Sequence, residues 1–300
     1  MRGLDPRIHP LTKTMDCRVN PGTDELKDLA MLADKGHLSI GAASLEYRMI
    51  GPRPDKAPTI VMLHEGLGSV STWGDFPQKL ADATGLGVLA YSRAGYGKSS
   101  TITLPRPLDY MQREATDVLP LLLDAIGFKR GILLGHSDGA TIAAWYAGSV
   151  QDHRVRGLVL MAPHFFMEAS NIEGIQQTVA TFETTNLPGR LARHHADVTA
   201  AFRGWSGAWL DPEFETFDTT DALAYIRVPI LAVQGAADPY GTRAQIRVVE
   251  DECYCPVETL VMDGVGHAPH REKPDDTLAA VAAFADRIFR AHGEGIENAA

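Results

Sequence analysis

Residues 131–147 read GILLGHSDGATIAAWYA, and this stretch decides the fold. Residues 131–135 form a short apolar run of the kind that is buried on both faces of a parallel sheet. The pentapeptide Gly135-His136-Ser137-Asp138-Gly139 follows, and an apolar run of helical character comes after it. A serine between two glycines at the end of a buried strand can occupy a sharp turn that exposes its hydroxyl. The stretch therefore predicts a strand, a reactive turn and a helix, with Ser137 as the candidate nucleophile.

Short β-type runs alternate with helical stretches along most of the chain. Helices are predicted over 109–126, 139–148 and 275–292. The predicted strands cover 45–50, 59–64, 87–91, 131–135, 155–161, 229–234 and 258–263. Such alternation is typical of an α/β protein in which helices cover both faces of a mostly parallel sheet.

Two segments do not follow this alternation. Residues 1–36 are rich in Pro, Gly and charge and are predicted to be a poorly ordered extension. Within them, LDPRIHPLTKTMDCRVNPG resembles translated repeat elements of alphaproteobacterial genomes, which implies a bacterial source and a start codon set too early. Residues 164–222 have helical bias and are far longer than an ordinary connection. We interpret them as a helical cap inserted into a core formed by residues 37–163 and 223–300.

Composition limits the partners. The chain has 300 residues, 45% of them hydrophobic, and a formal net charge of −10, which is typical of a globular protein and argues against a nucleic-acid surface. The three cysteines, Cys17, Cys253 and Cys255, suit neither a disulfide framework nor a zinc site. No signal peptide or membrane span is evident. We expect a cytoplasmic protein, monomer or dimer, whose partners are a small-molecule substrate and water, without metal or cofactor.

A serine nucleophile needs a base and an orienting acid. Asp238 follows the strand predicted at 229–234, and His267 follows the last predicted strand. Both would lie at the carboxyl edge of the sheet, as Ser137 does. Asp238 could instead cap a helix before Pro239, and His270 is a competing histidine that we expect at the surface.

These motifs together resemble the α/β-hydrolase superfamily over residues 37–292. LHEGLGS, YSRAGYGKS, GHSDG, VPILAVQGAADPYG and GHAPHREKP carry the resemblance, in that order along the chain. The resemblance implies an eight-stranded, mostly parallel sheet with a helical cap after strand 6. It also implies Ser137 as nucleophile, Asp238 as orienting acid and His267 as general base and then general acid.

The oxyanion hole of this superfamily uses two backbone N–H groups, one from the residue after the nucleophile, here Asp138. The second comes from the loop after His64, where the superfamily usually has His-Gly-x and this chain reads His64-Glu65-Gly66-Leu67-Gly68, so that Glu65 either replaces the glycine or is inserted before it. The second donor is therefore Glu65, Gly66 or, less favoured, Leu67, and we favour Gly66. A carboxylate of Asp138 that faced the oxyanion would oppose its charge by about 1 to 4 kcal/mol. We expect that side chain to turn away, toward the helix N-terminus or a cationic or amide partner.

Other residues have less specific signals. The substrate pocket is predicted to include His136, His164, Phe165, Phe166, Trp205 and Trp209, because a cap that closes over the site needs an apolar inner surface. His194, His195 and Asp197 are interpreted as a solvated helix face rather than a metal site.

Three functions fit these residues. We first expect a serine hydrolase that cleaves an ester, thioester or lactone of a small to medium, partly apolar substrate through an acyl-enzyme. An alternative is hydrolysis of a carbon–carbon bond in a ring-cleavage diketone, although relatives with that activity usually carry a Ser-Met-Gly-Gly elbow. Another is a ligand-binding protein or a cofactor-free oxygenase on the same fold. Substrate choice cannot follow from fold alone.

Overall fold

The computed structural model describes residues 32–291 of the chain. The chain divides into two units, Met1–Leu32 and Ala33–Ala300, and the description that follows concerns the second. The extension predicted for residues 1–36 therefore lies, up to residue 31, outside the described residues. Its predicted end is wrong, because the first strand, β1, already begins at Lys35.

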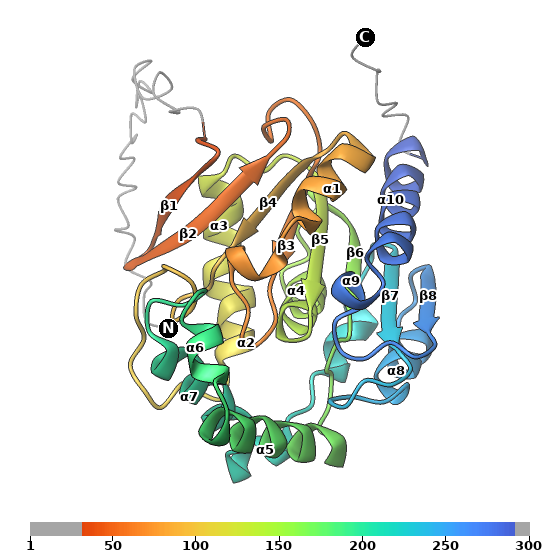
Figure 1. Cartoon of the computed structure of the whole chain (residues 1–300). Coiled ribbons are helices and arrows are strands. Elements are labelled where there is room, and N and C mark those ends of the chain that lie inside the picture. Colours follow the sequence, from red (N-terminus) through yellow and green to blue (C-terminus); the bar gives the residue numbers. More distant parts are fainter. Residues whose placement is uncertain (1–31, 292–300) are drawn as a thin grey trace, which may run out of the picture. The chain divides into compact units, whose positions relative to one another are not determined.

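The described part of the chain folds around one eight-stranded sheet (Figure 1). Strands β1 and β2 pair antiparallel with each other, β2 pairs antiparallel with β4, and all the remaining pairs are parallel. The order across the sheet is β1-β2-β4-β3-β5-β6-β7-β8. This arrangement confirms the predicted α/β-hydrolase fold. The strands are β1 (Lys35–Ile40), β2 (Ala43–Ile50), β3 (Thr59–Leu63), β4 (Gly87–Tyr91), β5 (Gly131–His136), β6 (Val155–Met161), β7 (Ile230–Gly235) and β8 (Val257–Met262).

Helices cover both faces of the sheet, which explains why its central strands are continuously apolar. Every residue of β3 and of β5 is buried. Alternate side chains of β3, such as Ile60 and Met62, pack in one cluster with residues of α1 (Phe76–Thr84) and α10 (Pro274–Ala291). Helices α3 (Leu119–Ala125) and α4 (Asp138–Ser149) lie on the opposite face (Figure 1).

The helix predicted over residues 109–126 is interrupted. It consists of α2 (Tyr110–Arg113), a π-helical turn η2 (Glu114–Val118) and α3. Pro120 stands in the first turn of α3 and has no N–H to donate to the carbonyl of Thr116. The regular hydrogen-bond ladder breaks there, and the wider π turn takes up the change.

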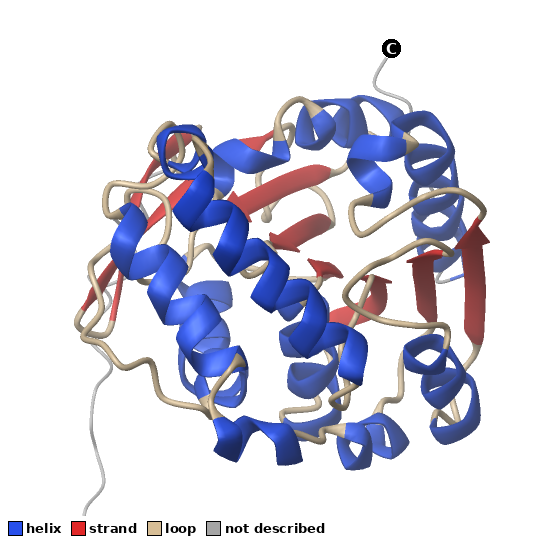
Figure 2. Ribbon diagram, turned by 60° about the horizontal axis from the view of Figure 1, so that its bottom comes forward, coloured by secondary structure: helices blue, strands red, loops and turns tan. Residues whose placement is uncertain are grey.

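The segment between β6 and β7 is helical and lies beyond the carboxyl ends of the strands (Figures 1 and 2). It contains α5 (Ala169–Thr184), α6 (Leu187–Leu191), α7 (Val198–Trp209) and the 3-10 turns η3 (Pro212–Thr216) and η4 (Thr220–Tyr225). We keep the interpretation of a cap for this segment. Its predicted end at residue 222 falls inside η4. The carbonyl of Ala222 packs closely on Gly148 of α4, since a β-carbon on Gly148 would lie 2.2 Å from the carbonyl oxygen.

Short elements complete the carboxyl edge of the sheet. They are η1 (Val70–Trp73), α8 (Ala244–Glu252) and α9 (Pro269–Glu272). Among residues 32–291, none of the helices has both the length and the apolar character needed to cross a bilayer.

Candidate active site

Ser137 occupies a strained turn between β5 and α4. Its φ of 54° and ψ of −122° lie in a region that non-glycine residues rarely adopt. The backbone N–H of Ser137 donates to the carbonyl of Met161 at the end of β6, at 2.9 Å. Strain of this kind persists only where the surrounding structure holds it, and it is common at functional sites.

The two glycines that flank Ser137 at a distance of two residues permit this turn. A β-carbon on Gly139 would lie 2.0 Å from the carbonyl oxygen of Leu63, at the end of β3. A β-carbon on Gly135 would lie 2.2 Å from the carbonyl oxygen of Gly139. The Gly-x-Ser-x-Gly spacing is therefore a packing requirement, because α4 begins directly against the backbone of β3 and β5.

Asp238 and His267 form a hydrogen-bonded pair. Asp238 follows β7, and its Oδ2 lies 2.8 Å from Nδ1 of His267, which follows β8. Gln234 Nε2 donates to the same oxygen at 2.9 Å, and the N–H of Tyr240 donates to Oδ1 at 2.8 Å. Burial raises the pKa of Asp238, but the His267 ring, the N–H of Tyr240 and the charge of His164 outweigh it and hold the pKa below its usual value. Asp238 does not cap a helix, since α8 begins only at Ala244.

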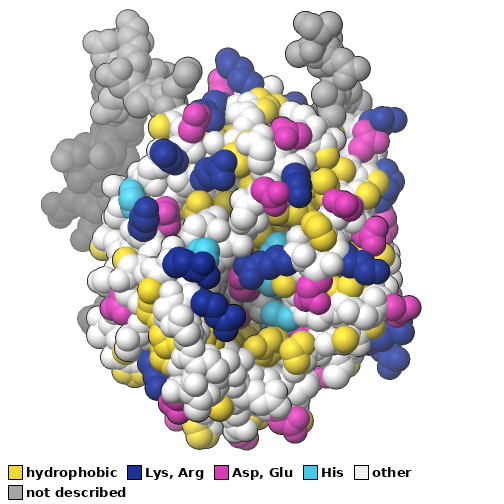
Figure 3. All heavy atoms as spheres, in the orientation of Figure 1, with side chains coloured by type: hydrophobic (Ala, Val, Ile, Leu, Met, Phe, Trp, Pro, Cys, Tyr) yellow, Lys and Arg dark blue, Asp and Glu magenta, His cyan; other side chains and the backbone are white. Residues whose placement is uncertain are grey.

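A cavity of about 180 Å³ lies at this edge of the sheet and includes both Ser137 and His267 in its wall. Histidine, acidic and basic side chains gather near the centre of the corresponding face (Figure 3). Of the predicted pocket residues, His136, His164, Trp205 and Trp209 line the cavity. The wall also contains Leu67, the less favoured oxyanion candidate, and residues that the sequence did not single out: Asn171, Ile175, Tyr240, Ala268 and Arg271.

Phe165 and Phe166 are not part of the cavity wall, so their predicted place in the pocket is wrong. Phe165 is buried, and its N–H donates to Oε1 of Gln245 at 2.7 Å. Phe166 forms an isolated β-bridge with Asp218. Both residues therefore anchor the base of the segment that leads to α5. Asn171 and Ile175, one helical turn apart on α5, occupy the wall instead, and their i, i+4 spacing is the signal that could have identified them.

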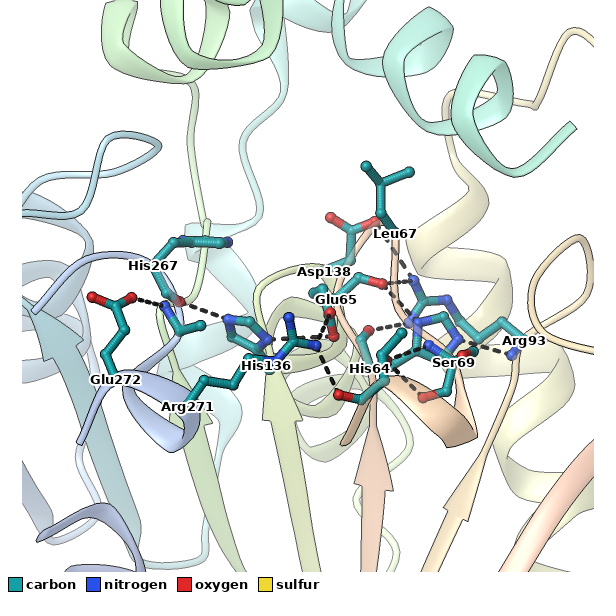
Figure 4. A network of polar contacts seen from close by, with 12 residues as sticks. His64, Glu65, Leu67, Ser69, Arg93, His136, Asp138, His267, Arg271 and Glu272 are labelled. Atoms are coloured by element: carbon teal, nitrogen blue, oxygen red, sulfur yellow. Dashed lines mark hydrogen bonds and ion pairs between the residues drawn. The ribbon is translucent and has the colours of Figure 1, made fainter. Parts of the chain in front are cut away.

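Arg93, which follows β4, contacts the loop after β3 (Figure 4). Its guanidinium donates to the carbonyl of His64 and, at 3.1 Å, to the carbonyl of Glu65. In a trans peptide the N–H points opposite to the carbonyl of the same unit, so the N–H groups of Glu65 and Gly66 point away from Arg93. Within residues 32–291 neither N–H donates to a protein acceptor. Both residues line the cavity.

Trp205 of α7 packs directly against Gly66. A β-carbon on Gly66 would lie 2.2 Å from the indole ring, so no other residue fits there without displacing Trp205. The segment between β6 and β7 thus contacts the loop that carries the candidate oxyanion donors.

The side chain of Asp138 has a defined set of buried partners. Its Oδ2 accepts a hydrogen bond from the Tyr110 hydroxyl at 2.6 Å and lies 3.7 Å from Nη2 of Arg93. The Tyr110 oxygen in turn accepts from Nε1 of Trp209 at 3.0 Å. Burial lowers the pKa of Arg93, but Asp138 and other neighbours outweigh it and raise the pKa above its usual value. Arg93 is thus the cationic partner that was one of the alternatives expected for Asp138.

Glu65 joins three segments of the site through its carboxylate (Figure 4). Oε1 lies 3.2 Å from Nη2 of Arg271, and Oε2 lies 3.5 Å from Nδ1 of His136. The other ring nitrogen of His136 lies 2.7 Å from the carbonyl oxygen of His267. Burial raises the pKa of Glu65, but His136 and Arg271 outweigh it and hold the pKa well below its usual range. The loop after β3 is therefore tied to the loop that carries His267.

Two buried histidines flank the site, and one of them, His270, differs from its predicted place. His270 is buried rather than exposed, and its ring lies 4.9 Å from Trp73 and 4.9 Å from His136 between centroids. Burial and the charge of His136 lower the pKa of His270 well below its usual value. His164 stacks on His267 at 5.6 Å, and burial together with the charge of His267 lowers its pKa to about 3. Both rings therefore remain neutral near pH 7.

The solvated helix face predicted for His194, His195 and Asp197 is also wrong. The two histidines lie in the connection between α6 and α7, where His195 is buried and accepts from the N–H of Gly97 at 3.1 Å. Asp197 caps α7 by accepting from the N–H of Ala200 at 2.8 Å. No group of three or more His, Cys, Asp or Glu side chains in residues 32–291 is arranged to hold a metal ion.

Comparison with known proteins gives a consistent result. A family model of the alpha/beta hydrolase family matches residues 60–281. The proline iminopeptidase of Lactobacillus helveticus is 25% identical over 280 residues, covering 80% of this chain and 94% of that protein. Epoxide hydrolase A of Mycobacterium tuberculosis is 26% identical over 307 residues, with coverage of 80% and 94%. A carboxylesterase crystal structure from Nitrososphaera gargenis superimposes with a TM-score of 0.69 at 19% identity, covering 85% of this chain and 100% of that one.

The fold and the site define a class: α/β proteins in which a sharp serine turn and a histidine–aspartate pair border one cavity at the carboxyl edge of a parallel sheet. The chain belongs to the alpha/beta hydrolase family, and the family match confirms the resemblance found in the sequence. The two curated relatives named above are both hydrolytic enzymes.

The partners of Asp138 lead to a prediction about stability. We expect Asp138→Asn to lower the free energy of unfolding by about 3 kcal/mol, because it leaves the buried Arg93 without its carboxylate. The folded variant keeps most of its turnover, since the backbone N–H at position 138 is retained. Urea unfolding and steady-state kinetics measure the two effects. Asp109→Asn, which removes an exposed partner of Arg113, is the matched control and costs less than about 1 kcal/mol. Loss of turnover in a fully folded Asp138→Asn protein would show that the carboxylate itself takes part.

The buried neutral histidines predict an acid-sensitive stability. The folded-state pKa of His270 is lowered, so below pH 6.5 the unfolded chain binds a proton at this position that the folded chain does not. Stability is therefore fully present above about pH 6.5 and is lost as the pH falls, at up to about 1.4 kcal/mol per pH unit for each such group. His270→Leu should reduce the difference in unfolding free energy between pH 7.5 and pH 5.5 by about 1 kcal/mol, measured by urea titration. His153→Gln, at an exposed position, should leave that difference as in the wild type. An unchanged difference in His270→Leu would contradict the account.

Proposed function

We propose that the chain is a serine hydrolase that cleaves an ester, thioester or lactone through an acyl-enzyme on Ser137. The observation that carries the proposal is the hydrogen-bonded pair of Asp238 and His267, 2.8 Å apart, whose histidine borders the same cavity as Ser137. With Nδ1 of His267 facing Asp238, Nε2 is the ring nitrogen that takes the proton of the serine hydroxyl.

The reaction proceeds in two halves. Ser137 Oγ attacks the carbonyl carbon while its proton passes to His267, and Asp238 stabilises the imidazolium. The N–H of Asp138 and that of Gly66 hold the oxyanion, with Glu65 as the alternative to Gly66. The leaving group departs with the proton from His267. Water, deprotonated by the same histidine, then attacks the acyl-enzyme and releases the acid and Ser137.

The size of the cavity favours a short acyl group. An engineered apolar protein cavity of about 150 Å³ binds benzene, so a cavity of about 180 Å³ accepts a group of similar size. Its wall includes the apolar side chains of Leu67, Ile175, Trp205 and Trp209. We therefore propose a carboxylesterase or lactonase acting on a small, partly apolar acyl group.

An aminopeptidase is a second candidate, because the proline iminopeptidase relative covers most of this chain. Such an enzyme must bind the free amine of its substrate, and a carboxylate that faces the cavity is the natural partner. The two acidic residues in the cavity wall, Glu65 and Asp138, are engaged with Arg271 and Arg93. The helices α5 and α7 contribute Asn171, Ile175, Trp205 and Trp209 to the wall, and none of these is acidic. These contacts favour the ester over the aminoacyl amide.

A cytoplasmic location is part of the proposal. Cys253 and Cys255 are free thiols, as is usual in a reducing compartment. The partners that we propose are the substrate and water.

The test combines labelling and turnover. Wild-type protein should react with a fluorophosphonate probe and hydrolyse p-nitrophenyl esters, with the highest kcat/KM for acyl chains of about two to six carbons. Ser137→Ala should lose the label and at least about 10⁴-fold in kcat. A prolyl-p-nitroanilide and a dienone acid serve as amide and carbon–carbon substrates, for which we expect no turnover. Wild-type rates in Ser137→Ala would contradict the proposal, and turnover confined to the anilide would identify the aminopeptidase.

A further inference from the structure

Arg271 is a cation in the cavity wall that the proposed reaction does not use. It lies on α9, four residues after His267, and its side chain is 48% exposed. Nη2 has two protein partners, the carboxylate of Glu65 at 3.2 Å and the carbonyl of Thr72 at 2.8 Å. Within residues 32–291, Nε and Nη1 have no acceptor. Donors of the guanidinium therefore remain available to a ligand in the cavity.

A second arginine, Arg193, belongs to a turn that neighbours Arg271. His194 Nδ1 lies 2.8 Å from the hydroxyl of Ser71, and Arg271 donates to the carbonyl of the next residue, Thr72. The turn that carries Arg193 and His194 is thus a neighbour of Arg271 across η1. Burial, followed by the charges of Arg193 and Arg271, lowers the pKa of His194. Figure 3 shows basic side chains beside the histidines near the centre of this face.

The nearby carboxylates already have partners within the protein. Glu272 accepts from the N–H of Ala268 at 3.0 Å through one oxygen and from the N–H of Gly266 at 2.7 Å through the other. One oxygen of Glu65 faces Arg271, and the other is buried beside His136. Glu272 and Glu65 are therefore engaged within the protein, while Nε and Nη1 of Arg271 are free among residues 32–291.

The position of Arg271 indicates which part of the substrate it meets. His267 protonates the leaving group in the proposed reaction, so the leaving portion lies on the side of His267. Ala268 and Arg271 line the cavity and come one and four residues after His267 in the chain, whereas the apolar wall residues Trp205, Trp209 and Ile175 come from α7 and α5.

We propose that the leaving portion of the substrate carries an anion, a carboxylate or a phosphate, which Arg271 binds through its free donors. A guanidinium binds both anions in the same forked geometry. Arg193 adds a longer-range attraction toward the cavity opening. The inference rests on the proposed function, because it assigns the leaving group to the side of His267.

A matched pair of substrates tests the inference in turnover. The 3- and 4-carboxyphenyl butyrates are compared with the isosteric 3- and 4-carbamoylphenyl butyrates, each rate being divided by that of uncatalysed hydroxide hydrolysis. In the wild type, the charged ester of at least one pair should have a kcat/KM about tenfold higher than its neutral isostere. The ratio should fall toward one in Arg271→Gln and take an intermediate value in Arg271→Lys. Arg48→Gln, the same change at an exposed position on β2, should leave the ratio unchanged.

The ratio is measured within each variant, so a partial loss of folded protein cancels. A ratio near one in the wild type, or a high ratio that survives in Arg271→Gln, would overturn the inference even when the neutral ester is hydrolysed and the proposed function therefore stands.

Direct binding makes the test independent of turnover. Calorimetric titration with benzoate and with phenyl phosphate should show that at least one binds the wild type and loses about tenfold in affinity in Arg271→Gln but not in Arg48→Gln. The tighter of the two identifies carboxylate or phosphate as the source of the anion. Binding of neither anion, or equal binding in Arg271→Gln, would overturn the inference.

Discussion

The candidate active site depends on the contacts that the guanidinium of Arg93 makes. The guanidinium is buried. It contacts the carbonyls of His64 and Glu65 and also the carboxylate of Asp138. A buried charge is costly unless it is paired and hydrogen-bonded, so these partners are held firmly around it. Because the two carbonyls face Arg93, the N–H groups of Glu65 and Gly66 face the other way. One side chain thereby orients the loop after β3 and neutralises Asp138, the acid that follows Ser137.

The segment between β6 and β7 reaches both sides of this arrangement. Trp205 packs on Gly66, and Trp209 donates to Tyr110, which donates to Asp138. The same two indoles line the cavity, so the cavity wall also supports the residues that carry the candidate oxyanion donors. Glu65 extends the network to the other side of the cavity through His136 and Arg271. The cavity wall and the candidate catalytic residues are therefore physically connected.

Sequence reasoning identified the fold because the apolar strands and the helical stretches have short-range patterns. It also predicted that Ser137, Asp238 and His267 lie at the carboxyl edge of the sheet, since the carboxyl ends of parallel strands meet there. It missed Arg93, which follows the apolar run GVLAY after one intervening residue, Ser92, in the stretch YSRAGYGKS that was used only for the family resemblance. The roles of Glu65 and Arg271 depend on a contact between residues 206 positions apart, and the burial of His270 depends on Trp73 and Phe76. No local pattern reports such contacts. The prediction that Phe165 and Phe166 line the pocket was wrong for a related reason. Aromatic character predicts that a side chain is buried, but it does not predict which part of the protein it packs against.

The orienting role of Arg93 is tested most directly by the kcat of Arg93→Lys on a short-chain p-nitrophenyl ester. A lysine retains the charge opposite Asp138 but cannot bridge two carbonyls as the planar fork does. Circular dichroism shows whether the variant is folded. The account predicts that kcat falls by about 10²-fold while KM changes little, because the loss concerns an interaction made mainly in the transition state. An unchanged kcat in the folded variant would contradict the claim that Arg93 orients the oxyanion donors.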